Sequence, residues 1–534
     1  MSSRIIWSEA QGGRNNLHRI SELAKSVFDK ASNGEDISIK MASDSNRSAA
    51  SSIEYAVKGH RMSVIHGPPG TGKTTTFAYV VNNMVGAQGN SLDSNEIFLY
   101  IAPTNELVKD MFQKVAVSYA LSNDLPALKR EVRVYGSQFD FSPDWEILNR
   151  QIGPEVKTII TTNYQRVFVP REMRPKFHIL VDEASKSPLH SPFQALAHDI
   201  TQSGELDGSF SIVGDPMQAI SLSESYQSSN KRMLLMPYIL RGMLDIPADE
   251  FRDNQTLLNE AERNLSREIF NFLDTTLRLP SPTHKGISEG FYSGGLKSKY
   301  LFRDRVRINE ANQNLSKQLS KESESLGQVT DSIQGALDTE KLLIFFHDNS
   351  RDPYSHQEGV LYNSRRGEIG IQAAIALSVL TGEKTAIITT YVDQYLQMRM
   401  LFQSKYASIA RKYGVESKIS FNTTQSMLGA ESYNTVLILG KEYKTGIYGT
   451  IYFMEPELLN VQLSRNRGPQ LIIGNLPSLE RSAAQSDRRE LNINYKPLEV
   501  TSRIILNQAG FEKGPANWKK RRDGDECEYM KLPE

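Results

Sequence analysis

The stretch that most constrains this chain is GPPGTGKT, residues 67–74. Gly67, Gly72, Lys73 and Thr74 fill the pattern Gly-x-x-x-x-Gly-Lys-Thr, an apolar run precedes it, and helix-compatible residues follow it. This order indicates a phosphate-binding loop, because glycines let successive backbone N–H groups converge on phosphate oxygens at a helix N-terminus. The stretch therefore predicts binding of a nucleoside triphosphate.

The side chains of this loop have distinct expected roles. Lys73 would reach the β- and γ-phosphates, and the hydroxyl of Thr74 would coordinate Mg²⁺. The expected cofactors are ATP, or another nucleoside triphosphate, and Mg²⁺. The residues expected to surround the nucleotide here are Gly67, Pro68, Pro69, Gly70, Thr71, Gly72, Lys73, Thr74 and Thr75.

Two further polar sites follow apolar runs downstream of the loop. HILVDEAS places Asp182 and Glu183 at the end of an expected strand, where Asp182 can support Mg²⁺ and Glu183 can orient or deprotonate water. SIVGDPMQ places Gln218 after another such run, where a neutral amide can hydrogen-bond a γ-phosphate or its water. The sequence therefore predicts the components of a hydrolytic site.

The composition is that of an ordinary protein without a membrane segment. The chain has 534 residues, with 62 Lys and Arg against 62 Asp and Glu, so any nucleic-acid-binding surface must be local. The single cysteine, Cys527, excludes an intramolecular disulfide and any zinc site built from several thiolates. The apolar runs are too short to span a bilayer. We expect a monomer inside the cell, in the cytoplasm, with the nucleus as the alternative.

Short β-rich runs alternate with helical patterns in two series, which predicts parallel sheets with crossover helices. We expect five segments: an N-terminal helical extension at 1–45, a first α/β domain at 46–303, a polar linker or helical insertion at 304–340, a second α/β domain at 341–480, and a polar C-terminal extension at 481–534. Helical insertions are expected inside the first domain.

The order of motifs resembles the 5′-to-3′ branch of superfamily 1 helicases, superfamily 1B, which includes the nonsense-mediated-decay RNA helicase. The matching stretches are GPPGTGKT (67–74), APTN (102–105), VDEAS (181–185), GDPMQ (214–218), LRLP (277–280), FYSGGL (291–296), ITTYVDQ (388–394), GAE (429–431) and LNVQLSRNR (459–467). The resemblance implies two RecA-like P-loop domains that hydrolyse ATP.

The resemblance also assigns roles to individual residues. It implies that Arg278 from the first domain and Arg465 from the second reach the γ-phosphate, so that closure of the interdomain cleft completes the site. It places Gly429 and Glu431 at the nucleotide. It implies that single-stranded RNA or DNA is contacted at Thr104, Asn105, Thr162, Thr390, Tyr391 and Thr423.

Two departures from the family pattern fall on the base side of the nucleotide. Ala49 stands near the position of a glutamine that reads adenine, and Leu277 replaces an aromatic residue that stacks on the base. Because hydrogen bonds and stacking separate adenine from other bases, we expect poor discrimination among nucleoside triphosphates.

The sequence therefore predicts an NTP-driven helicase or translocase that steps 5′ to 3′ on single-stranded nucleic acid. The alternative is a nucleic-acid-binding switch or scaffold whose slow hydrolysis controls attachment without unwinding.

Overall fold

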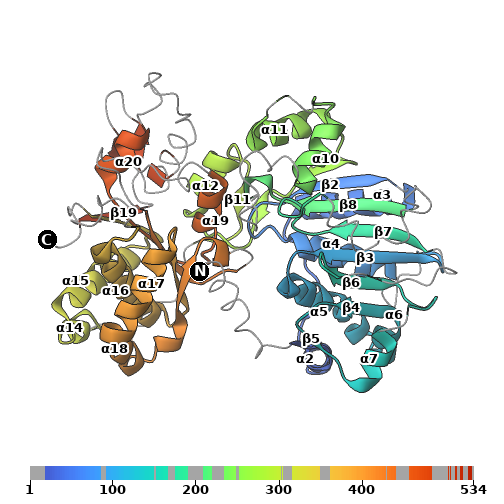
Figure 1. Cartoon of the computed structure of the whole chain (residues 1–534), viewed down its shortest axis with the longest axis horizontal. Coiled ribbons are helices and arrows are strands. Elements are labelled where there is room, and N and C mark those ends of the chain that lie inside the picture. Colours follow the sequence, from blue (N-terminus) through green and yellow to red (C-terminus); the bar gives the residue numbers. More distant parts are fainter. Residues whose placement is uncertain are drawn as a thin grey trace. The chain divides into compact units, whose positions relative to one another are not determined.

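The chain divides into two compact units, Met1–Asp274 and Thr275–Glu534, both drawn in Figure 1. The computed structural model describes residues 18–59, 61–85, 92–149, 152–165, 167, 175–189, 208–218, 234–247, 250, 252–301, 304, 315–348, 361–427, 430–440, 456–483, 503, 505–506, 511–513, 518–520 and 527–531. Among these residues, no helix is both long and apolar enough to cross a membrane.

The first unit is built on a seven-stranded sheet in which every neighbouring pair of strands is parallel, as the alternating pattern predicts. In spatial order its strands are β4 (Val132–Tyr135), β6 (Thr158–Thr162), β3 (Glu96–Ala102), β7 (Lys176–Val181), β8 (Gly208–Gly214), β2 (Met62–His66) and β9 (Phe270–Phe272). The strands β3, β6 and β8 are buried throughout, as both faces of a parallel sheet are when helices cover them. Sequence patterning missed β9, which is only three residues long.

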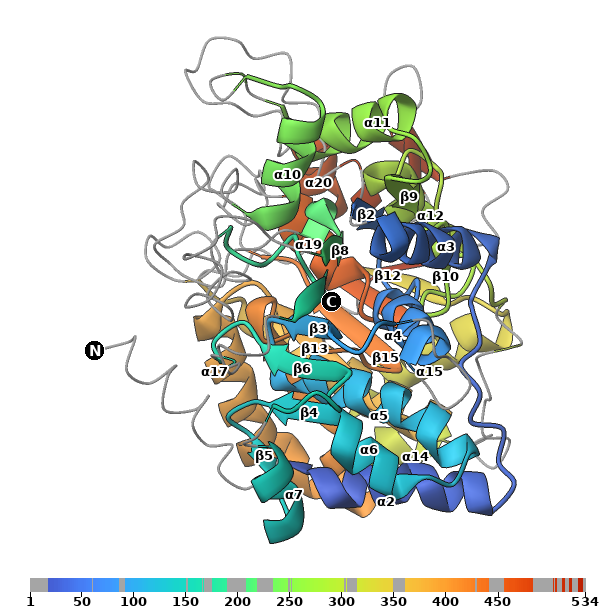
Figure 2. The ribbon, with the colours of Figure 1, turned by 90° about the vertical axis from the view of Figure 1, so that its right-hand side faces the viewer.

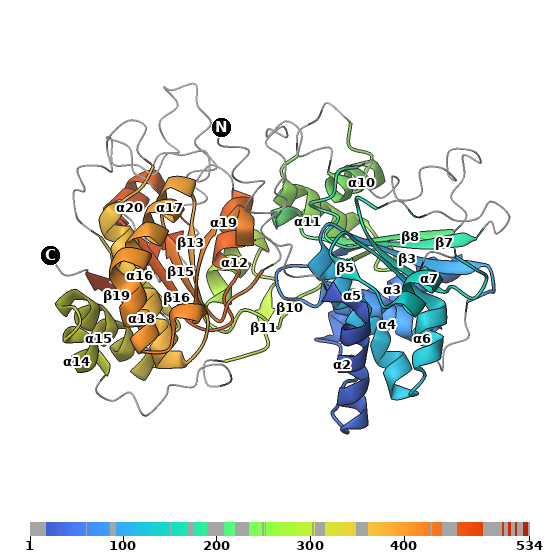
Figure 3. The same cartoon turned by 60° about the horizontal axis from the view of Figure 1, so that its bottom comes forward.

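Helices cover both faces of this sheet. They are α2 (Ile20–Ser32), α3 (Asp44–Gly59), α4 (Lys73–Val85), α5 (Asn105–Leu121), α6 (Leu125–Glu131), α7 (Pro143–Asn149), α10 (Leu235–Met243) and α11 (Asn254–Asn264). Figure 3 shows α4 and α6 on one side of the sheet and α10 on the other. Apolar residues of α2 to α5 form one core with alternate residues of the strands. A short parallel pair, β1 (His18–Arg19) and β5 (Phe139–Asp140), joins α2 to this core.

The second unit contains a six-stranded sheet that is also parallel throughout. In spatial order its strands are β14 (Ile419–Thr423), β13 (Thr385–Thr389), β15 (Asn434–Ile438), β16 (Gln470–Gly474), β12 (Leu343–His347) and β19 (Cys527–Lys531). The last of these strands lies in the segment that the sequence assigned to a polar C-terminal extension. In the structure that extension supplies an edge strand, because β19 pairs in register with β12.

The helices of the second unit are α12 (His284–Phe291), α14 (Leu315–Ser320), α15 (Glu324–Asp338), α16 (Ser364–Thr381), α17 (Val392–Leu401), α18 (Ala407–Lys412), α19 (Pro456–Leu463) and α20 (Leu476–Ala483). A π-helix, Phe402–Tyr406, joins α17 to α18. Short strand pairs are β10 (Thr275–Thr276) with β11 (Lys297–Ser298), and β17 (Phe511–Lys513) with β18 (Trp518–Lys520).

The segment expected to be a polar linker or helical insertion, 304–340, contains the helices α14 and α15. Helix α15 packs on α16, and its apolar residues Leu326, Val329 and Ile333 belong to the core of the second unit. Their spacing of three and four residues places them on one helix face, which was obscured in the sequence by the polar residues between them. The boundary between the two units does not lie in this segment. It lies before it in the sequence, between Asp274 and Thr275.

Candidate active site

The glycine-rich loop follows β2 and leads directly into α4, which begins at Lys73. Gly70 and Gly72 have φ angles of 70° and 83°, which are costly for any residue with a Cβ. The side-chain amide of Asn46 in α3 donates to the carbonyl of Thr71 over 2.9 Å. Helix α3 packs on both α4 and β2 (Figure 2), so the loop is held from the side by a neighbouring helix.

Lys73 lies over the loop that precedes it. Its ammonium donates to the carbonyl of Gly67 at 3.0 Å and lies 3.4 Å from a carboxylate oxygen of Glu183. A Cβ at Gly67 would come within 2.5 Å of the Lys73 side chain, so only glycine permits this position. The cation and the expected catalytic carboxylate are therefore within reach of each other above the phosphate-binding loop.

Thr74 and Asp182, the two residues expected to support Mg²⁺, meet directly. The Thr74 hydroxyl donates to a carboxylate oxygen of Asp182 at 2.6 Å, and the Tyr100 hydroxyl donates to the same oxygen at 2.7 Å. Asp182 is fully buried, and burial together with the charge of Glu183 raises its pKa, whereas Thr74, Lys73 and Tyr100 oppose that rise. Burial and the charge of Asp182 raise the pKa of Tyr100 well above its ordinary value, so this phenol stays a hydrogen-bond donor.

The donor set at Thr74 and Asp182 fits Mg²⁺. A hydroxyl and a carboxylate oxygen are hard ligands, and Mg²⁺ usually takes one or two protein oxygens together with water and substrate phosphates. Within the described residues no cluster of three or more His, Cys, Asp or Glu side chains could hold a metal without such help. The residues therefore suit an ion that arrives with the nucleotide.

Glu183 has a φ of 50°, in the left-handed region that a residue with a side chain seldom adopts. Its carboxylate contacts Lys73 on one oxygen and lies 3.0 Å from the ammonium of Lys186 on the other. The backbone N–H of Glu183 donates to Asp182 over 2.8 Å. The carboxylate of Glu183 thus contacts Lys73 over the phosphate-binding loop, whereas the carboxylate of Asp182 accepts hydrogen bonds from Thr74 and Tyr100.

Gln218 lies in a short 3-10 helix, Pro216–Gln218, directly after β8. Its amide donates to Asp215 over 2.6 Å, and the same carboxylate lies 3.1 Å from the His66 ring at the end of β2. The backbone N–H of Gly67 donates to the carbonyl of Gly214 over 2.8 Å. The Gln218 segment is thus hydrogen-bonded to the strand that carries the phosphate-binding loop.

A polar cavity of about 460 Å³ lies beside the residue that holds the loop. It is lined by Asp44, Ser45, Ser48, Glu262, Leu265, Arg267, Phe270, Asn271, Phe272 and Asp274. Ser45 donates to Asp274 and Ser48 to Asn271, each over 2.8 Å. Ala49, where the family has its base-reading glutamine, is fully buried and offers no polar atom.

Both expected arginines lie in the second unit, which corrects the placement of Arg278 in the first. The Arg278 guanidinium donates to Glu431 over 2.9 Å and to the carbonyl of Ser464 over 3.4 Å. Glu431 also pairs with Arg467. The reason is the position of the boundary, since Asp274 is tied to α3 whereas the next residues form β10 and pair with β11.

Arg465 is 2% exposed and is anchored by the backbone. Its guanidinium donates to the carbonyls of Val461 and Ala430 over 2.8 and 3.3 Å. These bonds hold the arginine beside the GAE stretch that the sequence also assigned to the nucleotide. Gly429 of that stretch lies outside the described residues.

The strand-contact candidates of the first unit gather at the carboxyl ends of two neighbouring strands. Thr104 follows β3 and accepts a hydrogen bond from the N–H of Leu107 as the cap of α5, and Asn105 donates to Ser137 over 3.4 Å. Thr162 ends β6 but is only 4% exposed. Two residues further on, Tyr164 is 73% exposed, and sequence reasoning missed it. The sequence feature that could have identified Tyr164 is its position directly after TTN, residues 161–163, where β6 ends.

The candidates of the second unit also follow adjacent strands, β13 and β14. Thr390 is buried and lies 3.4 Å from the Gln462 amide, whereas Thr423 is partly exposed. Tyr391 is 6% exposed, and a Cβ on Gly440 would come within 2.9 Å of its ring. A base could not stack on Tyr391 in this conformation, because its ring packs inside the protein.

Comparison with known proteins gives two findings on the sequence. The model of an AAA domain family matches residues 44–167, which include the phosphate-binding loop. The chain is 25% identical over 283 residues to the ATP-dependent helicase upf1 of Schizosaccharomyces pombe. Both matches are similarities over part of the chain. The match to the helicase covers 51% of this chain and 30% of the relative, so the chain spans less than a third of that protein's length.

Solved structures similar to this chain include two proteins bound to nucleic acid. An arterivirus nonstructural protein 10 helicase with DNA is 12% identical, with 81% of this chain and 62% of that chain covered and a TM-score of 0.34. Dbp5 of S. cerevisiae bound to RNA and ADP BeF3 is 9% identical, with 88% and 85% covered and a TM-score of 0.36. These scores are low, and the fold assignment depends on the two parallel sheets described above.

Proposed function

We propose that this chain is a nucleic-acid-stimulated ATPase that moves 5′ to 3′ along single-stranded RNA or DNA and unwinds duplexes. The single observation that supports this most is the cluster above the phosphate-binding loop, where Lys73, Thr74, Asp182 and Glu183 lie within hydrogen-bond or ion-pair distance of one another. The similarity to the ATP-dependent helicase upf1 supports the coupling of this site to nucleic acid.

In the proposed mechanism, each residue of the cluster has one task. The loop N–H groups and Lys73 bind the phosphates, while Thr74 and Asp182 position Mg²⁺, which neutralises charge on the phosphates when bound. Glu183 accepts a proton from the attacking water. The amide of Gln218 hydrogen-bonds the γ-phosphate or its water. Arg278 and Arg465 stabilise negative charge on the transferring phosphoryl group.

The test is steady-state ATP hydrolysis by the full chain without nucleic acid, then with single-stranded DNA or RNA of matched sequence. Lys73→Ala provides the blank, because it removes the cation that reaches the phosphates. Stimulation by either strand, with release of a strand from a 5′-tailed duplex, is the expected result. Hydrolysis above the blank with no stimulation would instead favour an NTP-controlled switch or scaffold that never unwinds.

Nucleotide specificity is expected to be weak. In the cavity beside Asn46, Ser45 is hydrogen-bonded to Asp274 and Ser48 to Asn271. The side chain of Ala49 has no polar atom that could hydrogen-bond a base. We predict kcat/KM values for ATP, GTP, CTP and UTP within about tenfold of one another, since lost hydrogen-bond readout removes the main source of discrimination. Side-by-side steady-state kinetics measure this, and a strong preference for ATP would contradict it.

Tyr164 is proposed as a stacking platform for a base of the bound strand. It stands exposed at the carboxyl end of β6, next to the strand that leads to Thr104 and Asn105. Because base–aromatic stacking contributes about 1–3 kcal/mol per base, Tyr164→Ala should weaken binding of single-stranded RNA or DNA by about tenfold or more.

Fluorescence anisotropy with a labelled oligonucleotide measures the effect of Tyr164→Ala. Tyr164→Phe should restore the affinity, because stacking needs the ring and not the hydroxyl. Tyr55→Ala is the matched control, since Tyr55 is also exposed, at 41%, but lies on α3. Equal affinities for Tyr164→Ala and the control would remove Tyr164 from the strand path.

A further inference from the structure

The second sheet ends in a strand whose outer edge is open. Among the described residues, β14 pairs with β13 and with no other strand. Each of its five residues is at least partly exposed, whereas β12, β13, β15 and β16 are buried along their whole length. Unpaired backbone N–H and C=O groups along such an edge can accept an additional strand.

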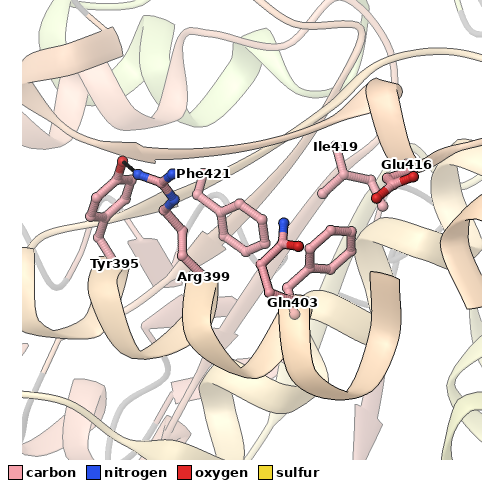
Figure 4. Close-up of a pocket in the computed structure, with 7 residues that line it drawn as sticks. Tyr395, Arg399, Gln403, Glu416, Ile419 and Phe421 are labelled. Carbon is pink, nitrogen blue, oxygen red and sulfur yellow. Dashed lines mark hydrogen bonds between the residues drawn. The ribbon is translucent and has the colours of Figure 1, made fainter. Parts of the chain in front are cut away.

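A groove runs between this edge strand and the helix beside it. It contains a cavity of about 380 Å³ lined by Tyr395, Arg399, Phe402, Gln403, Glu416, Ile419 and Phe421. Figure 4 shows Tyr395, Arg399 and Gln403 rising from the helix, with Ile419 and Phe421 extending from the strand to meet them. The cavity is large enough to hold one apolar side chain of a partner.

The wall of this groove contains the π-helix. Phe402, its first residue, packs edge-on against Phe421 with ring centroids 5.3 Å apart. A π-turn inserts one extra residue into a helix and is frequent at functional sites. Here the insertion occurs where the helix supplies Phe402 and Gln403 to the cavity lining.

An apolar stripe lies on α17 next to the cavity residues. Val392, Leu396 and Met400 recur every fourth residue and are 45%, 44% and 56% exposed. A four-residue spacing places the three side chains on one helix face. Contiguous exposed apolar side chains beside an open strand edge favour a protein partner.

The charge around the groove indicates what charge a partner would carry. Residues 391–423 include five Lys and Arg and two acidic residues, and Lys405 and Lys412 pair with Glu368 and Glu322 outside this range. Glu416 is neutralised by Arg411, which donates two hydrogen bonds of 2.8 Å to it. The exposed guanidinium of Arg399 lies 5.5 Å from the centre of the Tyr395 ring. In the described part of the chain, Arg399 is the one cation that lines the cavity, so an acidic side chain of a ligand can pair with it there.

We propose that β14 and α17 form a docking site for an extended, acidic peptide segment of a partner protein. The segment adds as a strand to the open edge of β14 and places an apolar or aromatic side chain in the cavity. Alternate residues of a strand point to the same face, so apolar residues at every second position meet α17. Single-stranded nucleic acid matches the charge but has no backbone amide to pair with the strand.

The test selects peptides from a random peptide library displayed on phage, using the full chain as the target. We expect enriched peptides in which acidic residues alternate with apolar or aromatic ones. One enriched peptide is then synthesised, and its binding is measured by fluorescence anisotropy. It should bind the Arg399→Glu and Met400→Glu variants at least about tenfold more weakly than the unmodified chain. Methylation of alternate backbone nitrogens in the peptide should abolish binding, because it removes the strand-pairing donors.

Lys317→Glu is the matched control, since it reverses an exposed charge on α14 of the same unit and should bind the peptide normally. Unchanged melting temperatures of the variants show that each is folded. Failure to enrich such peptides, or equal binding to all variants, would overturn the proposal. Loss of oligonucleotide binding in Arg399→Glu with no peptide binding to the unmodified chain would assign this surface to nucleic acid instead.

Discussion

Replacement of Glu183 by glutamine is expected to lower kcat for ATP hydrolysis by about 10²–10⁴-fold, because the amide cannot accept the proton of the attacking water. Nucleotide affinity should change little, since Lys73, Thr74 and the loop glycines remain. The Glu183 carboxylate is already directed over the phosphate-binding loop, 3.4 Å from Lys73. Single-turnover kinetics with saturating ATP separate the chemical step from binding and product release.

Glu35→Gln is the matched control for this substitution, because Glu35 is an exposed glutamate of the first unit outside the site. It should hydrolyse ATP at the rate of the unmodified chain. A Glu183→Gln variant that kept most of its activity would show that another group serves as the base. Binding of a fluorescent ATP analogue by both variants verifies that the loop is intact.

Replacement of Arg465 by alanine is expected to have an effect of similar or larger size. An arginine that stabilises the transferring phosphoryl group contributes about 10³–10⁵-fold to kcat. Arg465→Lys should recover little of this, because an ammonium lacks the planar fork of the guanidinium that donates in parallel to phosphoryl oxygens. Steady-state hydrolysis at saturating ATP, normalised to folded protein, measures both variants.

Burial of Arg465 makes a stability control necessary. Its guanidinium donates to two backbone carbonyls, so truncation also removes contacts within the second unit. Arg366→Lys is the matched variant, since Arg366 is an equally buried arginine of that unit with a 2.9 Å ion pair to Asp348. If both variants lost melting temperature and activity in the same proportion, Arg465 would have only a structural role.

Motifs that depend on consecutive residues could be predicted from the sequence alone. The phosphate-binding loop specifies its glycines, lysine and threonine within eight positions, and the acidic pair directly follows an apolar strand. Local chain direction then determines where these side chains emerge, because a strand, a tight loop and a helix leave little freedom. For the same reason, the alternation of apolar runs and helical patterns predicted both parallel sheets.

Features that depend on distant residues could not be predicted in this way. Nothing near Cys527 indicated that its segment would pair with β12, and the polar residues of 304–340 concealed the buried face of α15. Tyr391 was expected to contact the bound strand, but its ring is buried against Gly440. These outcomes depend on which surfaces meet in the folded chain, which sequence periodicity does not encode.

The sequence by itself predicted a nucleoside-triphosphate-binding loop within an α/β fold of two parallel sheets, because those features follow from local patterns of glycine, charge and apolar spacing. Only the tertiary structure decided how the side chains meet. It brought Asp182 to Thr74 across 108 positions of the chain, and it placed Arg278 with Glu431 in the second unit. The physical reason is that hydrogen bonds and burial act through space, and the sheets determine which distant strand ends become neighbours.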